Sequence, residues 1–159
     1  MNKVLIDIAI ERLSYQLIEK HNKFESSILI GLQPRGTFLC KRVLKKLRYL
    51  LPTIDIKSGN LDISFYRDDL MRRNHPIIPE IMDINLSFED KNIILVDDVL
   101  FTGRSIRSAL DAILAFGRPK TVELLTLINR RFSRHLPIEP TYVGKTIDAL
   151  SAEKVIVEW

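Results

Sequence analysis

The sequence predicts an α/β fold with a central, mainly parallel five-stranded sheet flanked by helices. Two observations favour this class. Apolar segments of strand length alternate along the chain with segments of helical periodicity, as in βαβ units. The apolar segments also contain few polar residues, which is typical of strands buried on both faces of a parallel sheet. A length of 159 residues suits one domain covering residues 1–159.

The first part of the chain is expected to contain two helices and two strands. Apolar residues recur at helical spacing from Ile6 to Leu17, and Asp7 is the expected N-cap of this first helix. Residues 26–32 are apolar and predict a strand. Residues 37–51 predict an amphipathic helix with its basic residues in solvent. The alternation over 60–66 predicts a second strand.

The rest of the chain predicts one long loop, further strands and one more helix. Residues 67–80 contain two prolines and little periodicity, so we expect a long mobile loop there. The elements expected after it are a strand over 81–88, a buried strand over 92–98, a helix over 103–116, a strand over 121–128, and short strands around Tyr142–Val143 and Val155–Val157.

Composition excludes several classes of protein. The one cysteine, Cys40, rules out a disulfide framework and a cysteine-based metal site. The N-terminus lacks a cleavage-site pattern and no apolar run reaches the length of a membrane span, so we expect a cytoplasmic protein without a membrane partner. The net charge of +4 suits an anionic ligand or nucleic acid.

Chemically informative residues follow the expected strands at one edge of the sheet. Binding sites of parallel sheets lie at the carboxyl ends of the strands, which gathers Gly31–Gly36, Asp97–Ser105 and Asn129–Arg131. Thr102–Ser105 opens a helix, where unpaired backbone N–H groups and two hydroxyls suit a phosphate. The alternative for this turn is simple N-capping of the helix. The pattern is neither a Walker A loop nor G-x-G-x-x-G.

The adjacent carboxylates of Asp97 and Asp98 add a second kind of binding group beside this turn. They are suited to accept hydrogen bonds from a vicinal diol, or to hold Mg²⁺ with help from a ligand. Three residues separate them from Thr102–Ser105, which we term the phosphate turn. A ribose 5-phosphate has hydroxyls and a phosphate at about the separation that this arrangement requires.

The stretch VDDVLFTGRS (96–105) resembles the phosphoribosyl-pyrophosphate signature of type I phosphoribosyltransferases. The wider segments IGLQPRG, LDISFYRDDL, IILVDDVLFTGRSIRSALDAILAFGRP and LPIEPTYVGKT resemble the PyrR family. Members of that family are uracil phosphoribosyltransferases that, in many bacteria, also attenuate pyrimidine-operon transcription by binding RNA. The resemblance implies a flexible hairpin loop, a small hood and a homo-oligomer, either a dimer or a tetramer. It also implies 5-phosphoribosyl 1-pyrophosphate (PRPP), uracil, UMP and pyrophosphate as ligands, with Mg²⁺ as cofactor.

The resemblance also implies roles for individual residues. Catalytic roles fall on Asp97, Asp98, Arg35 and Arg67, and the two aspartates would hold Mg²⁺ mostly through the substrate. The pyrophosphate loop would contain a non-proline cis peptide at Pro34–Arg35. The implied substrate-binding residues are Pro34, Arg35, Gly36, Asp97, Asp98, Val99, Leu100, Phe101, Thr102, Gly103, Arg104, Ser105, Asn129, Arg130, Tyr142 and Val143, and the implied RNA contacts are Arg12, Arg134 and Lys145.

The chain departs from the family pattern at places that affect the choice of ligand. Asn129-Arg130-Arg131 stands where the family usually shows Asp-Arg-Gly, near the expected base. Glu11 and Glu139 interrupt the expected basic face, and negative charge opposes binding of RNA phosphates. Two alternatives to a uracil transferase therefore stay open. One is an RNA-binding attenuator that uses the site as a nucleotide sensor, and the other is a transferase for hypoxanthine or guanine.

Overall fold

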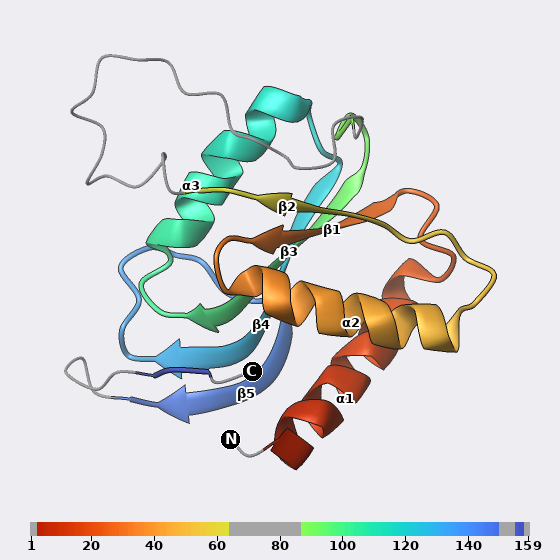
Figure 1. Ribbon diagram of the computed structural model, residues 1–159. Coiled ribbons are helices and arrows are strands. Elements are labelled where there is room, and N and C mark those ends of the chain that lie inside the picture. Colours follow the sequence, from red (N-terminus) through yellow and green to blue (C-terminus); the bar gives the residue numbers. More distant parts are fainter. Residues whose placement is uncertain (1–2, 64–86, 150–154, 158–159) are drawn as a thin grey trace.

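A computed structural model describes residues 3–63, 87–149 and 155–157 and contains one five-stranded sheet. The strand order is β2-β1-β3-β4-β5, and every neighbouring pair is parallel (Figure 1). The strands are β1 (Ser27–Leu32), β2 (Lys57–Leu61), β3 (Asn92–Leu100), β4 (Thr121–Arg131) and β5 (Tyr142–Asp148). The predicted fold class is confirmed. Because all strands run the same way, their carboxyl ends share one edge, with β3 at its centre.

Helices cover both faces of the sheet. Helices α1 (Lys3–His21) and α2 (Gly36–Leu50) lie on one face, and α3 (Arg104–Ile113), followed by the short 3₁₀ helix η1 (Leu114–Phe116), lies on the other (Figure 1). In β3, Ile94 and Val96 belong to the core under α1 and α2, whereas Ile93 and Leu95 belong to the core under α3. None of the helices in the described ranges has both the length and the apolar character needed to cross a bilayer.

Several expected boundaries are corrected by the structure. Helix α1 begins at Lys3, so Asp7 lies inside it and pairs with Arg42 of α2 at 2.5 Å instead of capping the helix. Strands β4 and β5 are longer than expected, because pairing between them continues to Arg131 and Asp148. Residues 155–157 form no strand; Val155 and Val157 pack against the α1-side core without pairing in the sheet.

The loop expected over 67–80 lies outside the described residues, as does most of the strand expected over 81–88. Its last two residues, Ser87 and Phe88, belong to no strand. Upstream, β2 begins at Lys57, three residues before the expected start at 60, and ends at Leu61.

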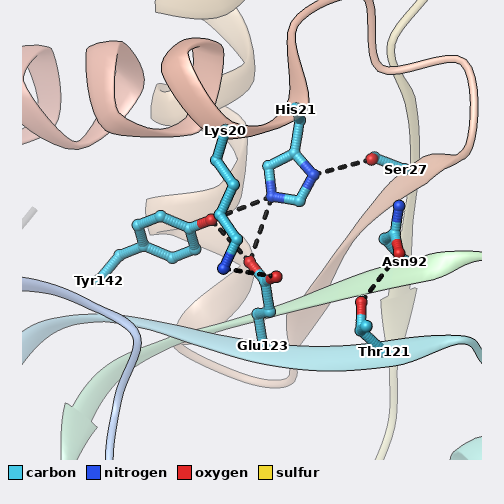
Figure 2. Close-up of polar contacts among 7 residues, drawn as sticks. All are labelled: Lys20, His21, Ser27, Asn92, Thr121, Glu123 and Tyr142. Carbon is cyan, nitrogen blue, oxygen red and sulfur yellow. Dashed lines mark hydrogen bonds and ion pairs between the residues drawn. The ribbon is translucent and has the colours of Figure 1, made fainter.

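A closed cluster of polar side chains lies at the amino-terminal end of the sheet (Figure 2). Glu123 of β4 accepts a hydrogen bond from the Tyr142 hydroxyl at 2.6 Å and pairs with the Lys20 ammonium at 2.9 Å. Nε2 of His21 lies 3.0 Å from the Tyr142 hydroxyl and 3.2 Å from Glu123 Oε2, and Nδ1 lies 2.9 Å from Ser27 Oγ. These contacts attach the end of α1 to β1, β4 and β5.

Candidate active site

The connection from β3 to α3 lines an open cavity of about 310 Å³ at the carboxyl edge of the sheet. Gly103 has a φ of 89°, in the left-handed region, and directs the chain into α3. No side-chain hydrogen bond caps α3, and Thr102 Oγ1 lies 3.4 Å from the Arg104 nitrogen, so capping by Thr102 is marginal. The cavity is lined by Asp97, Val99, Leu100, Phe101, Thr102, Gly103, Arg104, Ser105, Ile106 and Ser108.

The aspartate pair at the end of β3 is only partly satisfied by hydrogen bonds: Asp97 Oδ1 accepts one from the Asp98 nitrogen at 2.9 Å. Asp98 Oδ1 accepts a hydrogen bond from the Val99 nitrogen at 2.9 Å, whereas Asp98 Oδ2 is buried and has no hydrogen-bond partner in the described part of the chain. Burial, and then the charge of Asp98, raise the pKa of Asp97 to about 7. Burial also raises the pKa of Asp98, although the Val99 amide and the Arg35 charge oppose this. The Asp97 carboxyl thus lines the cavity, and Asp98 follows it in β3 with its Oδ2 open, an arrangement suited to hydroxyl or cationic groups.

The loop between β1 and α2 approaches these aspartates through Gly36. A Cβ atom at Gly36 would lie 2.3 Å from the Val96 oxygen and 3.0 Å from the Asp97 Cα, so this contact requires glycine. The expected cis bond at Pro34–Arg35 is wrong: the cis peptide is Gln33–Pro34, before the proline, where the trans preference is small. Pro34 does not open α2, which begins at Gly36.

Asn129 and Arg130 of β4 lie beside the start of the phosphate turn. Asn129 pairs with Leu100 of β3, and the Arg130 guanidinium lies 4.1 Å from the centre of the Phe101 ring. The structure therefore brings these two predicted residues to the cavity edge. Arg134, which the sequence assigned to RNA, instead contacts the Asn129 side chain and the Phe101 carbonyl.

Tyr142 is not brought to this edge. It opens β5, and its hydroxyl bonds Glu123 and His21 in the closed amino-end cluster (Figure 2). The expectation that Tyr142 flanks the sugar site is wrong, because β5 continues beyond it and Thr146 is the residue that pairs with Asn129. Only the strand register identifies Thr146, and no local sequence pattern points to it.

Val143 and Lys145 lie on β5, and Arg12 of α1 contacts the same stretch of this strand. The Val143 and Gly144 carbonyl oxygens accept hydrogen bonds from Arg12 of α1, at 2.8 and 2.5 Å. Lys145 follows directly and is exposed. Arg12 therefore contacts the residues next to Lys145, whereas Arg134, in the connection between β4 and β5, contacts the Phe101 carbonyl before the phosphate turn. Arg67 lies outside the described residues.

Comparison with known proteins matches this geometry to one family. The family model described as phosphoribosyl transferase domain matches residues 3–158. The bifunctional protein PyrR of Enterococcus faecalis is 40% identical over 158 residues, covering 99% of this chain and 87% of that protein. The bifunctional protein PyrR of Oceanobacillus iheyensis is 41% identical over 155 residues, covering 96% of this chain and 85% of that protein.

Solved structures agree on the fold. A hypoxanthine phosphoribosyltransferase from Staphylococcus aureus superposes with a TM-score of 0.70 at 20% identity, covering 92% of this chain and 76% of that one. A hypoxanthine-guanine phosphoribosyltransferase from Bacillus anthracis gives 0.69 at 17% identity, covering 93% and 80%. Such low identity supports the fold alone, whereas the closer sequence relatives are PyrR proteins. The chain is a pentosyltransferase of the phosphoribosyl transferase domain family and belongs, within it, to the PyrR proteins.

Proposed function

We propose that the protein transfers the phosphoribosyl group of PRPP to uracil, giving UMP and pyrophosphate. The observation that carries this proposal is the combination of the Asp97–Asp98 carboxyl pair, in which Asp98 Oδ2 has no hydrogen-bond partner among the described residues, with the start of α3 at Thr102–Ser105, which no side-chain hydrogen bond caps. The first group suits ribose hydroxyls and the second suits the 5-phosphate. A ligand with both features would contact the buried Asp98 oxygen and the amides at the start of α3 together.

In this proposal the reaction is a displacement at C1 of the sugar. N1 of uracil bonds to C1 as the C1–O bond to pyrophosphate breaks, and the N1 proton is released. Positive charge develops on the ring, and the carboxylates of Asp97 and Asp98 would stabilise it. Arg35, on the loop that Gly36 holds against β3, would contact the leaving pyrophosphate, and Arg67 would add to this contact.

The residues present fit Mg²⁺ only when the substrate completes its coordination. The described ranges contain no group of three or more His, Cys, Asp or Glu side chains that is suited to hold a metal. Asp97 and Asp98 provide two neighbouring carboxyls, one with a free buried oxygen. Mg²⁺ bound there with PRPP oxygens would neutralise charge on the pyrophosphate. The protein's part is to hold the sugar hydroxyls beside this position.

The Asn129 side chain supports a base with a ring carbonyl. Arg134 has only donors, so the Asn129 atom that faces it at 2.6 Å must be the amide oxygen. The amide nitrogen is then the group left to donate to a ligand. A donor suits a carbonyl of uracil, and it equally suits the 6-oxo group of hypoxanthine or guanine. The resemblance to the PyrR family favours uracil.

A panel of bases tests this proposal. With PRPP and Mg²⁺, we expect pyrophosphate release with uracil and little release with cytosine or adenine. Asn129→Ala should raise the KM for uracil more than the KM for PRPP. Pyrophosphate release with hypoxanthine or guanine but none with uracil would show that the substrate base is a purine. Binding of UMP without any turnover would favour the nucleotide-sensor alternative.

We also propose that RNA binding is weak, since the predicted contacts are engaged within the chain. Arg12 bonds β5 carbonyls, and Glu11 pairs with Lys46 of α2 at 2.6 Å. Lys145 remains exposed. A mobility-shift titration with a pyrimidine leader RNA should give a shallow dependence on salt, corresponding to only a few phosphate contacts. Tight binding stimulated by UMP would contradict this expectation.

A further inference from the structure

We propose that Arg134 is a positioning residue for the phosphoribosyl group: together with the His135 amide, it turns the carbonyls of the 101–103 loop outward and so directs the loop's N–H groups at the phosphate. This inference rests on the proposed function, because it concerns the same phosphate cradle. It assigns Arg134 a role inside the active site in place of the RNA contact expected from sequence.

Arg134 joins two parts of the site through one guanidinium. One of its terminal nitrogens donates to the Phe101 carbonyl oxygen, and the other donates to Asn129 Oδ1 at 2.6 Å. Its Nε lies 3.9 Å from Glu139 Oε1, and the side chain is only 16% exposed. A planar guanidinium with donors on both sides is suited to bridge two acceptors held at fixed positions. The start of the phosphate turn is thereby tied to the end of β4.

The adjoining residue repeats this contact with main-chain atoms. The His135 nitrogen donates to the Thr102 carbonyl oxygen at 3.0 Å. Side chains that follow His135 cover the next residue, since a Cβ atom at Gly103 would lie 3.3 Å from Ile138 Cδ1 and 3.5 Å from Leu136 Cβ. Residues 134–138, which we term the clamp segment, thus contact Phe101, Thr102 and Gly103 in succession.

The orientation of the amides follows from peptide geometry. In a trans peptide, the carbonyl of one residue and the N–H of the next point in opposite directions. Because the Phe101 and Thr102 carbonyls point to the clamp segment, the N–H groups of Thr102 and Gly103 point away from it. The other side of this loop is the cavity that Asp97 and Ser105 also line. Without the clamp segment, a carbonyl could turn toward the bound phosphate and repel it.

Preorganised donors increase affinity because their orientation need not be fixed when the ligand binds. A role in orienting amides distinguishes Arg134 from cations that act by charge alone. Arg131 provides the matched comparison: it lies on the same strand end, and its guanidinium forms an exposed pair with Asp148 at 2.6 and 2.8 Å, apart from the phosphate turn.

The test measures binding of ribose 5-phosphate with Mg²⁺ by titration calorimetry, which requires neither base nor turnover. For Arg134→Ala we expect binding about tenfold weaker, equal to about 1.4 kcal/mol. Arg134→Lys should also weaken binding severalfold, because a single ammonium group does not reproduce the bridge. Arg131→Ala should bind as the wild type does. In steady-state assays, the Arg134 variants should raise the KM for PRPP more than they lower kcat.

The outcomes separate the two proposals. Wild-type protein that fails to bind ribose 5-phosphate would remove the proposed function, and this inference with it. Wild-type binding together with full affinity in Arg134→Ala would overturn this inference alone. Full affinity in Arg134→Lys, lost on raising the salt concentration, would also overturn it by showing a charge effect. If Arg134→Ala does not fold, the folded Lys variant decides the question.

Discussion

Two carboxyl groups at opposite ends of the same sheet, Glu123 part-buried and Asp98 buried, have opposite surroundings. At the amino-terminal end, Glu123 is contacted by Tyr142, Lys20 and His21 (Figure 2). At the carboxyl end, Asp98 Oδ2 has no hydrogen-bond partner among the residues described. Burial tends to raise the pKa of Glu123, but the hydrogen bonds from Tyr142 and Lys20 outweigh it and the pKa falls below its usual value. The pKa values of Asp97 and Asp98 are both raised.

The difference indicates that the carboxyl group at one end of the sheet serves stability and the one at the other end is available for binding. A carboxylate whose acceptors are filled from within the chain stabilises the fold and has little left to offer a ligand. A buried carboxylate without partners costs folding free energy, and a ligand can recover that cost on binding. The first arrangement predicts a structural cluster and the second predicts the active site.

The largest expected effect comes from neutralising the open carboxyls. Asp97→Asn combined with Asp98→Asn should lower kcat/KM for PRPP by about a thousandfold or more, since charge stabilisation at C1 is lost. The melting temperature should stay equal or rise, because two like charges leave a buried site. Pyrophosphate-release kinetics and thermal unfolding measure the two quantities. Turnover near that of the wild type would show that the aspartates do not stabilise the reaction.

An intermediate effect is expected from the closed cluster, and it concerns stability only. Tyr142→Phe removes the hydroxyl that donates to Glu123 and faces His21, which should cost about 1–2 kcal/mol of unfolding free energy. The KM for uracil should not change, since Tyr142 lies away from the cavity. Urea unfolding and base-saturation kinetics test this, and a higher KM for uracil would restore Tyr142 to the base site.

The smallest expected effect is on the pH dependence of the free energy of unfolding, to which Asp97 and His21 contribute with opposite signs. The folded state keeps a proton on Asp97 up to about pH 7, above its ordinary value of 3.8, so its contribution to stability is lost as pH rises toward 7. Burial lowers the pKa of His21 below 6.5, despite the opposing charge of Glu123, and the nearby Lys20 lowers it further. The unfolded chain therefore binds that proton first, and stability is lost as pH falls below about 6.5.

Single variants separate these responses. Asp97→Asn should flatten the loss of stability between pH 5 and 7, and His21→Gln should flatten the acid-side loss, each by about 1 kcal/mol. The quantity to compare is the slope of the unfolding free energy against pH, because His21→Gln also lowers stability at every pH. Unchanged slopes in both variants would mean that neither group titrates differently on folding.

The fold and the phosphate turn were predictable because their signals are local. Apolar runs of strand length identify β1, β3 and β4, and the Asp-Asp pair followed by Thr-Gly-Arg-Ser identifies a turn between a strand and a helix. The gathering of Asp97–Ser105 and Asn129–Arg131 at one edge follows from their places at the ends of the predicted strands, and Asn129 does pair with Leu100. Each of these inferences needs only the sequence nearby and the rule that parallel strands share a carboxyl edge.

Other features depend on contacts between distant residues. Tyr142 was misplaced because its position relative to the edge is set by the register of β5 on β4, which the residues around it do not reveal. His21 and Tyr142 meet across 121 positions, so the closed cluster has no sequence signal. Arg134 resembled a surface cation, and only the path of the connection before β5 turns it toward Phe101.

The contact at Gly36 has a consequence for which ligands fit. Two main chains touch there, since even a methyl group at Gly36 would lie 2.3 Å from the Val96 oxygen. The spacing between the β1–α2 loop and the aspartates is therefore a hard-sphere distance, and interiors in such contact compress little. We therefore expect the site to select a sugar phosphate by the spacing of its groups, because the main-chain distance at Gly36 leaves little room to adjust.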